Sequence, residues 1–159
     1  MSLKTLVEKR KHTNSKIRVF VDEAKELCKT FFNIDYKYSD TEAVEELGVD
    51  SDLIDQLLED FTIQIIQSNI SFYNYLDTFK EEHLRPEEID FTDFRELAHK
   101  NLGVARNLRI KDSQEVLSRL MKEENLEKIN TLLQLLQACV IKLKPLTAYE
   151  AILLLELKK

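Results

Sequence analysis

The sequence predicts an all-α protein: an antiparallel four-helix bundle with additional N-terminal and C-terminal helices. Three observations predict this class. The chain of 159 residues has only two glycines and two prolines, so it lacks the many turns that an all-β fold requires. Apolar residues recur at helical spacing along most of the chain, as in helices with one buried face. Helices of this length joined by short connections typically pack as an antiparallel bundle.

Composition narrows the class of protein further. Apolar residues make up 43% of the chain and charged residues 33%, which is the balance of a folded globular protein. The net charge of −6 argues against a nucleic-acid partner, because such a partner requires a basic surface. No stretch approaches the roughly 20 apolar residues of a membrane span, and the charged start of the chain differs from a signal peptide. We therefore expect a cytoplasmic protein with no membrane insertion.

The N-terminal part, residues 1–39, is expected to contain a lead-in and one accessory helix. Residues 1–14 are polar and basic, and we interpret them as a frayed lead-in or linker. A helix is predicted from Ser15 to near Asn33, because apolar residues recur there at helical spacing. Residues 34–40 are interpreted as a connection.

The central part, residues 40–145, is expected to hold the bundle. Its predicted segments are a short helix at Thr41–Leu47, a long helix over about 51–79, a polar loop at 80–88, and helices over Thr92–Ile110, about 113–124 and about 126–144. Gly48 is a natural end for the short helix, and Asp50 or Ser51 can cap the long one. Pro145 terminates the last helix of this part.

The C-terminal part, residues 146–159, is predicted to form one more helix. Thr147 and Glu150 have the spacing of a capping box at its start. Residues 151–155 are apolar on nearly all sides. We interpret the segment as a helix folded onto the bundle, and the alternative is a face for homo-association, because an exposed apolar patch favours a partner.

The cysteines and two of the three histidines are not predicted to form sites. Cys28 and Cys139 lie in apolar periodic segments, and in a cytoplasmic protein we interpret them as reduced core residues. His12 and His83 lie in polar segments and are interpreted as solvated. The histidines have neither the mutual spacing nor the nearby cysteines of a zinc site, so no metal is expected.

The remaining histidine, His99, is predicted to face solvent from the helix over residues 92–110. At about 100° per residue, the core side of this helix holds Phe94, Leu97, Ala98, Asn101, Ala105 and Leu108. His99 lies roughly 140° around the helix from the centre of that side. Arg95, Gly103 and Arg106 stand at positions i−4, i+4 and i+7 from His99 and share its face.

This face suits phosphoryl transfer. An imidazole can accept a phosphoryl group as a nucleophile, and arginines beside it would attract that group. A glycine inside a helix, such as Gly103, costs about 1 kcal/mol relative to alanine, and it is tolerated where something must approach the backbone closely. The residues alone leave open the alternative that His99 is a solvated histidine with incidental neighbours.

The run AHKNLGVARNL, residues 98–108, resembles the signature of histidine-containing phosphotransfer (Hpt) domains of bacterial two-component phosphorelays. The matching positions are Ala98, His99, Gly103, Ala105, Asn107 and Leu108. Residues 46–61 look like an earlier helix of that family, and residues 112–137 look like its last two helices. The resemblance therefore covers about residues 40–145, with Arg109 standing where the family often has glycine.

The resemblance implies a four-helix bundle that relays phosphate in signal transduction without autonomous catalytic activity. His99 would accept a phosphoryl group from a phospho-aspartate on the receiver domain of a response regulator or hybrid histidine kinase. It would then pass that group to an aspartate on another receiver. Magnesium would be held by the receiver, so the chain itself needs no cofactor. Gly103 would admit the receiver, and Arg95, Lys100 and Arg106 would complete the phosphoryl-stabilising or docking face.

Leu102 departs from the family pattern, which has a lysine three residues after the histidine. Lys100 points roughly 100° away from His99 and is not a clean substitute, whereas Arg95 and Arg106 share the histidine's face and could supply the charge. The missing lysine leaves a second function open. In that alternative the chain is a degenerate Hpt-like bundle that binds receiver or kinase domains without being phosphorylated.

Overall fold

The computed structural model describes residues 3–33, 36–82 and 85–157, without the side chains of residues 4–14. All regular secondary structure in these residues is helical, which confirms the all-α class. The helices are α1 (Leu3–Phe32), α2 (Thr41–Leu47), α3 (Ser51–Glu81), the 3-10 helix η1 (Pro86–Glu88), α4 (Thr92–Asn107), α5 (Lys111–Leu120), α6 (Leu126–Leu143) and α7 (Pro145–Leu157). None of the described helices combines the length and the apolar character needed to cross a membrane.

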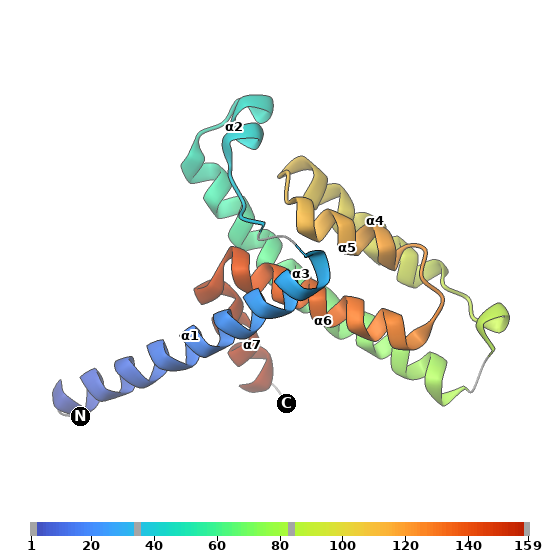
Figure 1. Cartoon of the computed structure of the whole chain (residues 1–159), viewed down its shortest axis with the longest axis horizontal. Helices are drawn as coiled ribbons and strands as arrows, with labels where there is room; N and C mark the ends of the chain where they lie inside the picture. The colour runs from blue at the N-terminus through green and yellow to red at the C-terminus, as the bar shows by residue number, and fades with distance from the viewer. Residues whose placement is uncertain (1–2, 34–35, 83–84, 158–159) are drawn as a thin grey trace.

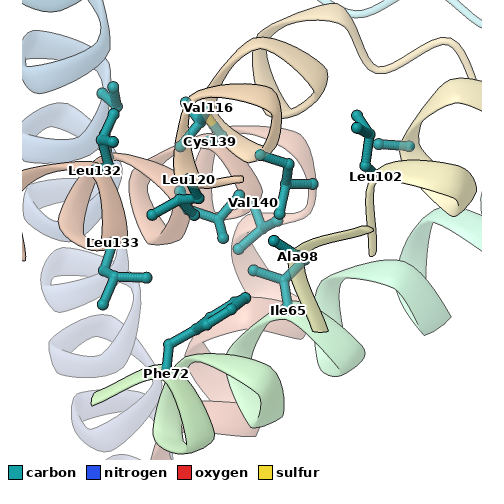
Figure 2. Packing of buried hydrophobic residues seen from close by; sticks show 14 of the residues in the cluster. Ile65, Phe72, Ala98, Leu102, Val116, Leu120, Leu132, Leu133, Cys139 and Val140 are labelled. Carbon is teal, nitrogen blue, oxygen red and sulfur yellow. The ribbon is translucent and has the colours of Figure 1, made fainter. Parts of the chain in front are cut away.

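The hydrophobic core lies among α3, α4, α5 and α6. These helices contact one another in a closed ring: α3 packs on α4, α4 on α5, α5 on α6, and α6 on α3. Figure 2 shows buried side chains from all four helices, among them Ile65, Phe72, Ala98, Val116, Leu120, Leu133 and Val140. Each large apolar side chain buried in this way stabilises the fold by about 1.5–3 kcal/mol, so the ring is the main source of stability.

Helices α1 and α7 pack on the outside of this ring. α1 lies on α6, and α7 contacts α3, α6 and α1. In Figure 1 the N-terminal half of α1 extends away from the other helices. α7 buries Ala148 against the core but leaves Leu146, Leu153, Leu154 and Leu157 exposed. The C-terminal helix therefore folds onto the body of the protein and still presents an apolar outer side.

Helix α1 begins at Leu3, well before the start predicted at Ser15. The stretch predicted as a lead-in has no glycine or proline, and it is rich in Lys, Glu and Arg, which are good helix formers. Nothing local therefore stops the helix from extending to Leu3. It ends as predicted near Asn33, where a φ of 56° gives the left-handed conformation that ends many helices.

The junction between α2 and α3 matches the prediction. Gly48 has a φ of 66°, and its N–H donates to the carbonyl of Val44, which closes α2. The carboxylate of Asp50 accepts a hydrogen bond from the N–H of Leu53 at 2.8 Å and caps α3. All apolar residues predicted on the inner side of α3 are buried: Ile54, Leu58, Phe61, Ile65, Phe72, Leu76 and Phe79. α3 ends at Glu81, slightly beyond the predicted start of the loop.

Helix α4 ends at Asn107, earlier than the predicted Ile110. Arg109 adopts the left-handed conformation with a φ of 59°, and the N–H of Ile110 donates to the carbonyl of Ala105 at 3.0 Å. This bond, together with the buried side chain of Ile110, is the arrangement of a Schellman motif. The chain turns sharply here, and α5 begins at Lys111, earlier than predicted.

Candidate functional site

Buried apolar side chains determine which side of α4 faces solvent. Phe94, Ala98, Ala105 and Leu108 lie in the core as predicted, and Leu97 is partly buried. They recur at helical spacing, so the opposite side of the helix is left outside the core. Burial therefore sets the rotation of α4 about its axis.

A buried polar contact between α3 and α4 reinforces this rotation. The side-chain amide of Asn101 donates to the hydroxyl of Ser68 at 3.1 Å and to the carbonyl of Leu97 at 3.0 Å. Its oxygen accepts a hydrogen bond from Gln64 at 2.8 Å. Turning the helix would separate Asn101 from Ser68 and Gln64, and a buried polar group left without a partner costs about 1–3 kcal/mol. The sequence predicts Asn101 on the core side but does not predict its partners on α3.

His99 lies on the exposed side of α4, as the sequence predicts. Lys100, Gly103 and Arg106 are also exposed and stand within two turns of it. We refer to these four residues as the His99 face. Neither Lys100 nor Arg106 forms an ion pair with any residue that the structure describes. Both charges are therefore directed to solvent or to a partner.

Gly103 has open space around it. A Cβ atom added there would meet nothing within 4 Å, and the residue does not have a positive φ. Neither packing nor backbone conformation in this chain requires a glycine at this position, although alanine would be favoured in a helix by about 1 kcal/mol. The effect of the glycine is to leave the backbone of α4 accessible, one turn from His99.

Arg95 contacts two other side chains. Its guanidinium pairs with Glu124 at 3.3 Å and lies over the ring of Phe91, 5.1 Å from the ring centre. Glu124 belongs to the connection between α5 and α6. Arg106 has no such contacts within the described residues and is exposed, so it is the better placed of the two arginines to meet a group on His99.

Leu102, where the resemblance to the Hpt signature would place a lysine, is only 2% exposed. The sequence interpretation did not include it among the core residues of α4, because it lies at the edge of the apolar side. Its burial adds apolar contact between α4 and the core, so this position contributes no charge to the surface. Of the cations of α4 near His99, Lys100 and Arg106 are the ones without an ion pair to a described residue.

A second group of polar side chains lies where α1, α5, α6 and the connection after α1 meet. The ammonium of Lys142 donates to the carbonyl of Tyr36 at 2.9 Å and lies 3.8 Å from the carboxylate of Asp112. Burial raises the pKa of Asp112, and the Lys142 charge opposes that rise. We refer to these three residues, with the adjacent thiols of Cys28 and Cys139, as the polar corner.

The two cysteines lie on neighbouring helices, Cys28 on α1 and Cys139 on α6. Both are free and buried. The Cys139 side chain, aided by the Lys142 ammonium, lowers the pKa of Cys28. The Cys28 side chain and burial raise the pKa of Cys139 well above its ordinary value. The sequence predicts each cysteine as a core residue, and the structure confirms this.

The structure does not describe the side chains of the other two histidines. His83 lies outside the described residues, and His12 belongs to the part of α1 whose side chains are not described. Within the described part of the chain, no three His, Cys, Asp or Glu side chains lie close enough together to hold a metal ion.

Comparison with known proteins gives no relative from which a role could be transferred. No family model, curated protein or solved structure matches the chain. A function therefore has to be inferred from its own residues and contacts.

Proposed function

We propose that the chain is a phosphorelay intermediate of the Hpt type, with His99 as the phosphoacceptor. The observation that carries this proposal is Gly103. It is a glycine inside a helix, its surroundings are open, and it stands one turn from an exposed histidine. Glycine here costs about 1 kcal/mol of stability relative to alanine, and the chain's own packing does not explain why a glycine stands at this position. A receiver domain that must bring its phospho-aspartate to His99 would explain the glycine, because a side chain at position 103 would stand in its way.

In the proposed reaction, the neutral imidazole of His99 attacks the phosphorus of the receiver's phospho-aspartate. The phosphorus–nitrogen bond forms as the bond from phosphorus to the aspartate oxygen breaks, and a free carboxylate remains on the receiver. Arg106 would attract the phosphoryl oxygens through its exposed guanidinium. Transfer from His99 to a second receiver reverses these bond changes, and the receivers supply the magnesium.

We also propose that α3, α4, α5 and α6 form the antiparallel four-helix bundle of this family. Their closed ring of contacts supports this, as does the match of the resemblance to about residues 40–145. α1 and α7 would be accessory helices.

The exposed leucines of α7 support homo-association as a further proposal, because an apolar outer side favours a second copy.

The test is phosphotransfer from a labelled, phosphorylated receiver domain to the purified chain. We expect acid-labile, base-stable phosphate on the wild type and none on His99→Gln, with His12→Gln as the matched control that keeps the label. Arg106→Ala should slow the transfer more than Lys100→Ala. Equal, negligible effects of those two substitutions would contradict the role of Arg106 while leaving that of His99 standing.

Burial of Leu102 favours a second candidate function, a bundle that binds receiver or kinase domains without carrying phosphate. The His99 face would then dock a partner without chemistry. This alternative predicts no label on the wild type with any receiver of a broad panel, together with measurable receiver binding that Gly103→Arg abolishes. Label on the wild type that His99→Gln removes would exclude it.

A further inference from the structure

Charge is distributed unevenly along the chain. Residues 3–18 hold six lysines and arginines against one glutamate, a net charge of +5, whereas the whole chain carries −6. Residues 40–60 hold nine aspartates and glutamates and neither lysine nor arginine. We refer to residues 3–18 as the basic arm and to residues 40–60 as the acidic end. Segregation of opposite charges into separate segments is typical of a charged arm that binds an oppositely charged surface.

The basic arm is the first half of α1, which extends away from the other helices (Figure 1). Among its described side chains, Lys16 and Arg18 are exposed and form no ion pair with any residue that the structure describes. Leu3 is 78% exposed. Most of the stability of a helix in a protein comes from packing of its apolar face. The arm therefore offers positive charge and an exposed leucine to a partner.

The acidic end consists of α2 and the first turns of α3. Three of its carboxylates, those of Glu45, Asp52 and Asp60, are exposed and form no ion pair within the described part of the chain. Leu47 and Leu53 lie among them and are 44% and 45% exposed. This end therefore combines negative charge with an apolar surface, which is complementary to the basic arm.

The arm of a chain does not reach the acidic end of the same chain. α1 is one unbroken helix from Leu3 to Phe32, so its first turns cannot fold back. In Figure 1 these turns point away from α2 and lie on the far side of the molecule from it. The matching surface is available on a second copy. Two copies that exchange arms reciprocally form a closed dimer with two-fold symmetry.

We propose that the basic arm of one copy binds the acidic end of a second copy, and the reverse, to form a dimer. The lysines and arginines of the arm pair with Glu45, Asp52 and Asp60, and its apolar residues cover Leu47 and Leu53. Single exposed ion pairs contribute little to stability. The apolar contact therefore supplies most of the affinity, and the charges determine which surfaces meet. This contact depends neither on phosphotransfer by His99 nor on the outer side of α7.

The first test is sedimentation velocity of the full-length chain over a range of concentrations and salt. We expect a dimer whose dissociation constant rises about tenfold between 0.1 M and 1 M salt, because the screening length falls from about 10 Å to about 3 Å. A protein that stays monomeric at every concentration would overturn the proposal. So would self-association that salt leaves unchanged.

Charge reversal tests which surfaces meet. Lys11→Glu/Arg18→Glu changes the arm at two positions that stand two turns apart, and Glu45→Lys/Asp52→Lys changes the acidic end. Each variant alone should be monomeric, because like charges then face each other. An equal mixture of the two should form a dimer again, because each arm meets an acidic or basic end of opposite sign. Circular dichroism checks that both variants are folded. A mixture that stays monomeric although both variants are folded would overturn the proposal.

Two controls separate this contact from other kinds of binding. Lys122→Glu/Lys128→Glu reverses two exposed charges outside the arm and should dimerise as the wild type does. Leu154→Gln changes the outer side of α7 and should keep the salt-sensitive dimer. Association that Leu154→Gln abolishes and arm reversal does not would overturn the proposal and assign the contact to α7. A wild type that is monomeric but binds vesicles of anionic lipid would overturn it too, because the arm would then bind a membrane surface.

Discussion

The His99 face and the polar corner hold their charged groups in opposite settings. The His99 face comes from a single helix, and all four of its residues are exposed. The polar corner draws on α1, α5, α6 and the connection after α1, and its charges are largely buried and contact one another. The difference teaches that burial and partners decide whether a charged side chain is available for binding. The residue type alone does not decide it.

This comparison gives a rule that substitutions can test. A substitution in the His99 face should alter the rate of phosphotransfer, while the free energy of unfolding stays nearly unchanged or rises. A change in the polar corner should lower stability and leave the chemistry of His99 intact in molecules that are still folded.

The largest effect on stability is expected from Lys142→Met. It would leave the buried carboxylate of Asp112 without its cation, and breaking a buried pair in this way costs about 3 kcal/mol. The double variant Lys142→Met/Asp112→Asn should recover most of that loss, because no unpaired charge remains. Urea unfolding followed by circular dichroism measures both variants. A double variant as unstable as the single one would show that the two groups are not coupled.

Gly103→Ala should act in the opposite direction. The free energy of unfolding should rise by about 1 kcal/mol, because alanine is the better helix former and the added Cβ meets nothing within 4 Å. Transfer of phosphate to His99 should nevertheless slow, because the methyl group stands where the receiver approaches. Gly48→Ala is the matched control and should lower stability, since Gly48 has a φ of 66°. A stabilised Gly103→Ala variant with an unchanged transfer rate would break the link between this glycine and docking.

A pH dependence confined to alkaline solution is expected from Tyr38. Burial raises the pKa of Tyr38 to about 12, and its hydroxyl donates to the carbonyl of Leu108 at 2.7 Å. The unfolded chain loses this proton near the ordinary tyrosine pKa of about 10, whereas the folded chain keeps it. The stability from this difference is present below pH 10 and is lost as the pH rises from about 10 to about 12. Tyr38→Phe should flatten the decline in that range, measured by urea unfolding across it. If the stability of the wild type and of Tyr38→Phe fell identically over this pH range, the loss would come from other titrating groups.

The exposure of His99 is predictable because it depends on one helix. Periodicity alone places His99 outside and Ala98 inside, and the structure agrees. The ends of helices are predicted where a local residue determines them, as at Gly48 and Asp50. The end of α4 is missed because Arg109 adopts a conformation that arginine rarely takes.

The polar corner is not predictable in the same way. Asp112 resembles an ordinary acidic residue near the start of a helix, and Lys142 an ordinary lysine near the end of one. Only the packing of α1 and α5 on α6 brings them together with Cys28 and Cys139. Their partners lie far apart along the chain, and neither periodicity nor local motifs carry that information.

The end of α4 limits how far the chain can be shortened around His99. The hydroxyl of Tyr38 binds the carbonyl of Leu108, and the hydroxyl of Tyr36 donates to the carbonyl of Arg109 at 3.4 Å. Both tyrosines precede residue 40, so a fragment covering only residues 40–145 lacks these two contacts. It also lacks α1, which covers part of α6. The smallest piece that keeps α4 as it stands in the whole protein therefore includes α1 and the connection that follows it.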